Sequence, residues 1–255
     1  MAHPIVVTGE PGAGKTTLVA RLAREIGVSV ALPGGVAESR RIDAQRYQRL
    51  GIAVSEGSGE SCIVETCAYG DGWTGYAALV IVVVDAVAPD SVDPQLLTLA
   101  DLVVLSRGDL VDPTPVYDAI AQHCQVPVRE APHGALEIAG LPAGSTRRVS
   151  LPARAAMACW SYAGAARLNA ALAERLLTDR PAGVTRIKGI VFGDATGLEV
   201  DRTGRARSVT PCAAPEETML FAAGALDSFQ EQDMALHFAE IASAGAARAG
   251  WFGFR

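Results

Sequence analysis

Aromatic residues are scarce in this chain, where Phe, Trp and Tyr together make up 5% of 255 positions. Alanine, valine, leucine and glycine are abundant instead. This composition favours a parallel sheet covered by helices over a β-sandwich. A chain of this length can form one large α/β domain or two smaller domains.

Cysteine and long apolar runs are also scarce. The five cysteines are Cys62, Cys67, Cys124, Cys159 and Cys212. They are odd in number and scattered, which argues against a disulfide framework. The chain opens without a basic segment followed by an apolar one, and its longest apolar run, residues 77–84, is too short to span a bilayer. We therefore expect a protein of the reducing cytoplasm with no membrane partner.

Positively charged residues are fewer than negatively charged ones: the chain has 22 Lys and Arg residues and 28 Asp and Glu residues, which gives a net charge of −6. No block rich in Lys or Arg stands out in the sequence. Nucleic-acid-binding proteins usually carry such basic patches. The charge pattern therefore argues against a nucleic-acid partner.

What the chain does contain is a P-loop pattern, G-x-x-x-x-G-K-[ST], at residues 9–16 between an apolar run and a helical pattern. Its glycines permit backbone angles that turn successive N–H groups toward phosphate oxygens. Lys15 supplies positive charge to the phosphates as a catalytic residue, and the Thr16 hydroxyl suits Mg²⁺. The predicted nucleotide-binding residues of this loop are Gly9, Glu10, Pro11, Gly12, Ala13, Gly14, Lys15, Thr16 and Thr17.

Short apolar segments alternate with helical patterns over residues 1–143, which predicts βαβ units and a P-loop NTPase domain of three layers around a mostly parallel sheet. The expected strands are 5–8, 28–32, 52–54, 62–64, 80–84, 102–105 and 126–128. The expected helices are 16–26, 42–50, 94–100 and 116–123. Functional loops should follow the carboxyl ends of the strands.

The pattern changes after about residue 140, where residues 142–148 resemble a linker. Hairpin-like strands and two helices then predict a small α+β domain over residues 146–255. The expected strands are 157–162, 186–192, 198–200 and 217–222, and the expected helices are 165–177 and 231–242. The alanine-rich tail, residues 243–250, is expected to be loosely ordered.

Glu65 closes a short apolar strand about fifty residues after Lys15. An acidic residue there matches the Walker-B position, which helps to hold Mg²⁺, and we predict a metal and catalytic role for it. The alternative is an ordinary solvated glutamate at a strand end.

Ser106, Arg107 and Asp109 follow a later apolar strand, where GTPases place the guanine-reading Asn-Lys-x-Asp segment. The Asp109 carboxylate can accept two hydrogen bonds from the guanine edge, and adenine lacks that donor pair. Arg107 could cover the base with its planar head. The alternative is a surface turn in which Asp109 caps a helix.

Taken together, the ordered motifs make the chain resemble the CobW/HypB/UreG group of P-loop GTPases, and CobW-like proteins most closely. The matching segments are 9–18, 42–44 (Ile-Asp-Ala), 63–66 (Ile-Val-Glu-Thr), 83–86 (Val-Val-Asp-Ala), 100–110, 186–189 (Arg-Ile-Lys-Gly) and 217–221. The resemblance implies GTP binding, slow hydrolysis, Mg²⁺ dependence and delivery of metals or metal cofactors to a client protein. It also places Asp43 in a switch-like segment near Mg²⁺, although Asp43 suits the start of a helix equally well.

Three departures from the family pattern bear on function. The usual C-x-C-C motif is replaced by Ser-Glu-Gly-Ser-Gly-Glu-Ser at residues 55–61, so a thiolate site for Zn²⁺ or another transition metal lacks its ligands. Glu-Thr-Thr-Gly becomes Glu-Thr-Cys-Ala at residues 65–68, and Asn-Lys-x-Asp becomes Ser-Arg-Gly-Asp at residues 106–109. Cys62 is interpreted as a core residue, and Cys67 is kept as a functional candidate.

The remaining candidates are isolated residues. The histidines His3, His123, His133 and His237 do not cluster in the sequence and are expected at the surface, with His133 following the last strand of the sheet. Trp73 lies in a glycine-rich segment and is interpreted as a packed anchor, with a lid as the alternative.

The sequence therefore predicts a GTP-hydrolysing accessory protein that acts on a client and is compatible with a homodimer. Two alternatives stay open. One is a P-loop kinase of small molecules, and the other is a degenerate nucleotide-binding regulator without catalysis.

Overall fold

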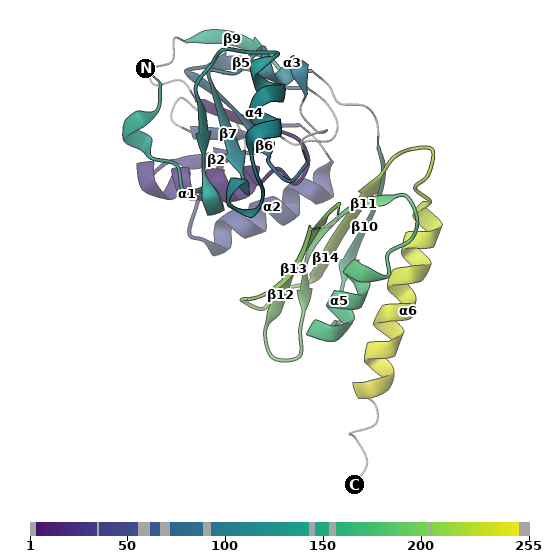
Figure 1. Ribbon diagram of the computed structural model, residues 1–255. Helices are drawn as coiled ribbons and strands as arrows, with labels where there is room; N and C mark the ends of the chain where they lie inside the picture. The colour runs from purple at the N-terminus through teal and green to yellow at the C-terminus, as the bar shows by residue number, and fades with distance from the viewer. Residues whose placement is uncertain are drawn as a thin grey trace. The chain divides into compact units, whose positions relative to one another are not determined.

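A computed structural model describes residues 4–34, 36–55, 62–66, 72–88, 93–142, 146–152, 157–204 and 206–249. The chain divides into two compact units (Figure 1). The first consists of Met1–Val36 and Asp43–Ala155, and the second of Ala37–Ile42 and Ala156–Arg255.

The first unit is built on a seven-stranded sheet in which every pairing is parallel, with the order β3-β2-β4-β1-β6-β7-β8. Its strands are β1 (Ile5–Gly9), β2 (Ser29–Ala31), β3 (Val54–Ser55), β4 (Cys62–Glu65), β6 (Leu79–Asp85), β7 (Leu102–Ser106) and β8 (Val128–Glu130). The predicted parallel α/β domain is confirmed, and β1, which precedes the glycine-rich loop, lies near its centre.

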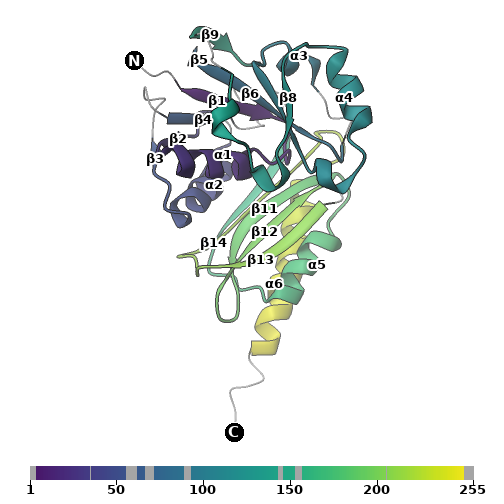
Figure 2. The ribbon, with the colours of Figure 1, turned by 60° about the vertical axis from the view of Figure 1, so that its left-hand side comes forward.

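The apolar runs of these strands are continuous because both faces of the sheet are covered. Alternate residues enter opposite cores, as Val80 and Val82 do on one side and Ile81 does on the other. Helix α1 (Lys15–Ile26) and the part of α2 (Ala37–Arg49) that belongs to this unit, from Asp43 onward, lie on one side of the sheet. Helices α3 (Pro94–Leu97) and α4 (Thr114–Ala121) lie on the other (Figure 2). The first unit therefore has three layers.

A two-stranded antiparallel ribbon of β5 (Thr74–Ala77) and β9 (Arg147–Ser150) belongs to the same unit. The interpretation of 142–148 as a linker is wrong at its end, because Arg147 and Arg148 pair with β5. Trp73 is 7% exposed within the core beside this ribbon, which confirms it as a packed anchor.

The second unit contains a five-stranded antiparallel sheet with the order β10-β14-β11-β12-β13. The strands are β10 (Ala158–Gly164), β11 (Val184–Phe192), β12 (Gly197–Thr203), β13 (Ala206–Cys212) and β14 (Thr218–Gly224). Helices α5 (Ala170–Thr178) and α6 (Glu231–Ala249) lie along one face (Figure 2). Leu172 and Leu176 of α5 join Phe238 of α6 in the core of this unit, which is the predicted α+β arrangement.

Several sequence-based boundaries are wrong for physical reasons. Strand β13 was not predicted, because it is a mostly exposed strand at the edge of its sheet without apolar alternation. Helix α5 begins later than predicted, after Asn169, whose Oδ1 accepts a hydrogen bond from the Leu172 amide at 3.0 Å.

The tail expected to be loosely ordered continues α6 to Ala249, since alanine has the highest helix propensity. Helix α2 begins at Ala37 instead of residue 42.

Gly9 is required where β1 enters the loop. Its φ is +142°, and a Cβ there would lie 2.2 Å from the Val83 carbonyl oxygen on the neighbouring strand β6. We predict that Gly9→Ala lowers the free energy of unfolding by about 2 kcal/mol more than Gly27→Ala, as measured by denaturant titration without nucleotide.

The control, Gly27, also has a positive φ, +71°, but nothing lies within 4 Å of its Cβ position. Equal losses in the two variants would show that the contact with β6 does not matter.

Candidate nucleotide-binding site

The predicted site residues meet at one edge of the parallel sheet. Glu65 is in register with Val7 of β1, and Ser106 is in register with Asp85. The carboxyl ends of β1, β4, β6 and β7 therefore lie side by side, as the rule for parallel sheets requires.

The loop that joins β1 to α1 has the backbone of a phosphate cradle. Gly9, Gly12 and Gly14 all have positive φ values, 142°, 77° and 90°. Gly14 also caps α1, and a Cβ at that position would lie 3.3 Å from the Ser106 Cβ. The loop thus closes against β7 and leads directly into the start of a helix, where N–H groups attract anions.

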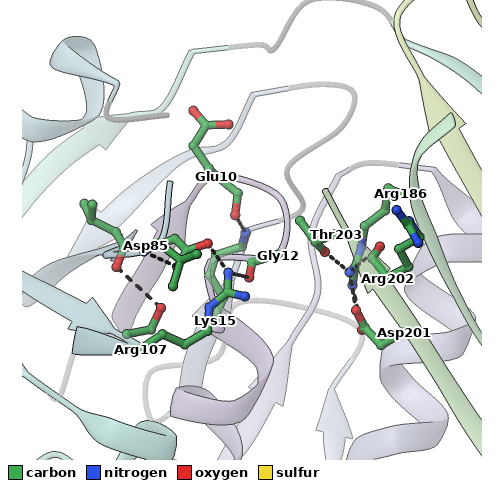
Figure 3. Close-up of polar contacts among 12 residues, drawn as sticks. Glu10, Gly12, Lys15, Asp85, Arg107, Arg186, Asp201, Arg202 and Thr203 are labelled. Carbon is green, nitrogen blue, oxygen red and sulfur yellow. Dashed lines mark hydrogen bonds and ion pairs between the residues drawn. The ribbon is translucent and has the colours of Figure 1, made fainter. Parts of the chain in front are cut away.

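Lys15 is held at the mouth of this loop. Its side chain is buried, and Nζ donates hydrogen bonds to the carbonyl oxygens of Gly9 at 2.9 Å and Glu10 at 2.8 Å (Figure 3). The Glu10 carboxylate points away from the ammonium group. Phosphate oxygens that carry charge are stronger acceptors than these neutral carbonyls.

The Glu65 carboxylate is held by two hydroxyl groups. Thr16 Oγ1 donates to Glu65 Oε1 at 2.8 Å, and the Tyr47 hydroxyl donates to Glu65 Oε2. Glu65 is 4% exposed and Tyr47 is fully buried. The alternative of a solvated surface glutamate is thus wrong, since the side chain lies beside the loop and away from solvent.

Burial raises the pKa of Glu65, and the nearby Asp43 carboxylate raises it further, while hydrogen bonds from Tyr47 and Thr16 and the charge of Lys15 oppose the shift. Asp43 is itself 9% exposed and lies 3.6 Å from the Arg46 Nη1. Two carboxyl groups and a hydroxyl brought together in a buried place are oxygen ligands of the kind that Mg²⁺ takes. The residues present therefore fit this cation.

On the other side of the loop, Arg107 forms an ion pair with Asp85 (Figure 3). Its Nη2 also lies 3.5 Å from the Gly12 carbonyl oxygen. Arg107 adopts a left-handed backbone conformation, with φ 57°, before the short helix η2 (Gly108–Leu110). The guanidinium therefore connects the segment 106–109 to both the phosphate loop and the end of β6.

Asp109 is exposed on η2, and no side chain caps this short helix. The capping alternative is not observed, because Arg107 and not Asp109 is the N-cap residue of η2. Base reading by Ser106, Arg107 and Asp109 stays a prediction.

No role was predicted for Tyr47, Asp85 or the turn η3 (Pro132–Gly134). Gly134, with φ 74°, lies against the start of α1, where a Cβ would be 3.0 Å from the Thr17 carbonyl. The exposed His133 lies in the same turn. Of these three, only Tyr47 could have been suspected from the sequence, because it lies one helical turn after Asp43, a predicted Mg²⁺ residue.

The remaining sequence candidates do not form a metal site. Cys62 is buried in the core, as interpreted, and Cys67 and His3 lie outside the described residues. Within the described ranges, no three His, Cys, Asp or Glu residues converge. The same part of the chain has no helix long and apolar enough to cross a bilayer.

The raised pKa of Glu65 predicts a pH effect on stability in the absence of metal. Between its ordinary value of 4.5 and the raised value, the folded state keeps a proton that the unfolded chain has released. The free energy of unfolding should therefore fall as pH rises through this interval, by at most about 1.4 kcal/mol per pH unit. Glu65→Gln should remove this fall in denaturant titrations with EDTA.

The matched control is Glu137→Gln, which changes an exposed glutamate of the same unit. Parallel pH profiles for wild type and Glu65→Gln would contradict the assignment.

No protein-family model and no curated protein matches this sequence. Among solved structures, HypB from Helicobacter pylori in complex with nickel aligns at 16% identity over 52% of this chain and 79% of that chain, with a TM-score of 0.40. The signal recognition particle receptor FtsY from Elizabethkingia anophelis aligns at 14% identity over 57% and 63%, with a TM-score of 0.38. A complex of sup35 with GDP aligns at 11% identity over 89% and 64%, with a TM-score of 0.30. These values assign neither a family nor a function to this chain.

Proposed function

We propose that the protein binds GTP together with Mg²⁺ and hydrolyses it slowly. The observation that carries this proposal is the phosphate cradle at the end of β1, with Lys15 at its mouth and the Thr16 hydroxyl hydrogen-bonded to the buried Glu65. A chance glycine-rich turn would not place a lysine, a hydroxyl and a buried acid around one helix start.

Each residue has a defined task in this proposal. Lys15 exchanges the carbonyl oxygens of Gly9 and Glu10 for phosphate oxygens, and the first amides of α1 donate to the same anion. Because Thr16 donates its proton to Glu65, its lone pairs stay available to a cation. Thr16, Glu65 and Asp43 would hold Mg²⁺, which neutralises phosphate charge when bound.

Hydrolysis at such a site depends on positioning and charge neutralisation more than on covalent chemistry by the protein. Lys15 contributes positive charge beside the phosphates. The buried acids Glu65 and Asp43 would hold the cation beside the phosphates.

The choice of guanine rests on Asp109, which is exposed on η2, two residues after Arg107, at the same edge of the sheet. A carboxylate accepts both donors of the guanine edge. The ion pair of Arg107 with Asp85 supports this assignment, because it anchors the segment that carries Asp109.

The proposal extends to an accessory role in which GTP hydrolysis serves the delivery of a metal or metal cofactor to a client protein. Its support is the ordered set of motifs in the sequence. Since no group of three His, Cys, Asp or Glu residues converges in the described part of the chain, the transported metal would be held by the client or by residues outside that part.

Lys15→Ala should abolish tight GTP binding, because the cradle then lacks its positive charge. A fluorescent GTP analogue measures the dissociation constant. Arg21→Ala is the control, since it removes an exposed positive charge from the same helix. Unchanged affinity in Lys15→Ala would refute the proposed site.

Asp109→Ala should reduce the preference for GTP over ATP by at least about 10-fold, because a site that pairs with polar groups rejects a base that lacks them. Competition between the two nucleotides measures the ratio, with Asp118→Ala, another exposed aspartate of this unit, as the control. A preference for ATP in the wild type, or indifference of the variant to the base, would favour the small-molecule kinase.

A further inference from the structure

A tyrosine–glutamate hydrogen bond lies beneath the proposed Mg²⁺ site, and its donor has no role in the function proposed above. The Tyr47 hydroxyl donates to Glu65 Oε2, whereas Thr16 donates to Glu65 Oε1 at 2.8 Å. Each oxygen of this carboxylate is therefore engaged by a different hydroxyl, from a different helix.

We propose that Tyr47 is a positioning residue that fixes the Glu65 carboxylate and thereby sets how much Mg²⁺ the protein needs to bind nucleotide. The inference rests on the proposed function, because the cation reaches the site with a nucleotide. Tyr47 itself does not contact nucleotide or metal in this scheme.

The burial of Tyr47 indicates that its hydroxyl group has a role beyond packing. The side chain is fully buried in the core between the sheet and α1, where phenylalanine would fill the space equally well. A buried hydroxyl costs free energy unless it has a partner. Burial is also the main cause that raises the pKa of Tyr47, so the hydroxyl keeps its proton as a donor.

The geometry of Glu65 explains why a second donor matters. The negative charge of Asp43, which lies one turn before Tyr47 on α2, acts on the Glu65 carboxylate and raises its pKa. Repulsion between the two acids favours rotation of one away from the other. Donors on both oxygens oppose that rotation, and groups that orient a metal ligand in this way commonly change metal affinity by about 10- to 100-fold.

The test is a Mg²⁺ titration of nucleotide binding with Tyr47→Phe, which removes the hydroxyl and keeps the ring. A fluorescent guanosine diphosphate is bound first in EDTA and then at rising Mg²⁺. We expect the Mg²⁺ concentration at half-effect to rise about 10-fold, while affinity in EDTA stays within about twofold because Lys15 and the loop are intact.

Tyr117→Phe is the matched control. Tyr117 also donates to a glutamate, Glu130 Oε1, at 3.1 Å in the same unit, but that pair is exposed. The Mg²⁺ concentration at half-effect for the Tyr117→Phe variant should equal that of the wild type.

A double variant separates positioning from packing. If Tyr47 acts through Glu65, Tyr47→Phe should cause no further change in the Mg²⁺ requirement once Glu65→Gln is present. Additive losses, or an unchanged Mg²⁺ requirement in Tyr47→Phe alone, would overturn the inference. So would an equal loss of affinity in EDTA and in Mg²⁺, which indicates a packing role.

The wild-type measurement distinguishes this inference from the proposed function. If the wild type binds ATP with Mg²⁺ and not GTP, the guanine assignment fails, and the same titration with a fluorescent ATP analogue decides the role of Tyr47. If the wild type binds neither nucleotide, the proposed function fails and this inference fails with it.

Discussion

The buried Glu65 carboxylate is the constraint on which the site depends. Taking a carboxylate out of water costs free energy, and two hydroxyl donors and the nearby Lys15 charge offset only part of that cost, since the pKa of Glu65 is still raised. These contacts join the end of β4 to the start of α1 and to α2. The same arrangement places acidic oxygens together in a buried position, so stability and the proposed Mg²⁺ binding depend on one cluster.

The parallel sheet explains why such a cluster can form from distant segments. Strands that run in one direction place all their carboxyl ends at one edge, so the loops after β1, β4, β6 and β7 become neighbours. Strand β1 lies between β4 and β6, which brings Glu65 to one side of the phosphate loop and Asp85 to the other. The strands are buried on both faces, so close packing surrounds the elements that carry these residues.

Much of the fold was predictable because its signals are local. Continuous apolar runs indicated β4, β6 and β7, and the glycine spacing with Lys15 indicated the phosphate loop. Strand β13, at one edge of its sheet, and the start of α2 were missed. Strand β13 is mostly exposed and has no apolar alternation, and α2 is a polar helix whose early residues resemble a loop. Local pattern thus identified elements that bury apolar surface and failed for those that do not.

The sequence by itself determined the kinds of chemistry available: a glycine-rich loop with the spacing typical of phosphate binding, a charged Lys15, an acid at Glu65 and a carboxylate at Asp109. Only the tertiary structure decided which groups work together. Tyr47 reaches Glu65 because α2 packs on the sheet, and Arg107 reaches Asp85 because β6 and β7 are adjacent in register. These pairs join residues that are far apart in the chain, and their geometry follows from packing, which no local spacing encodes.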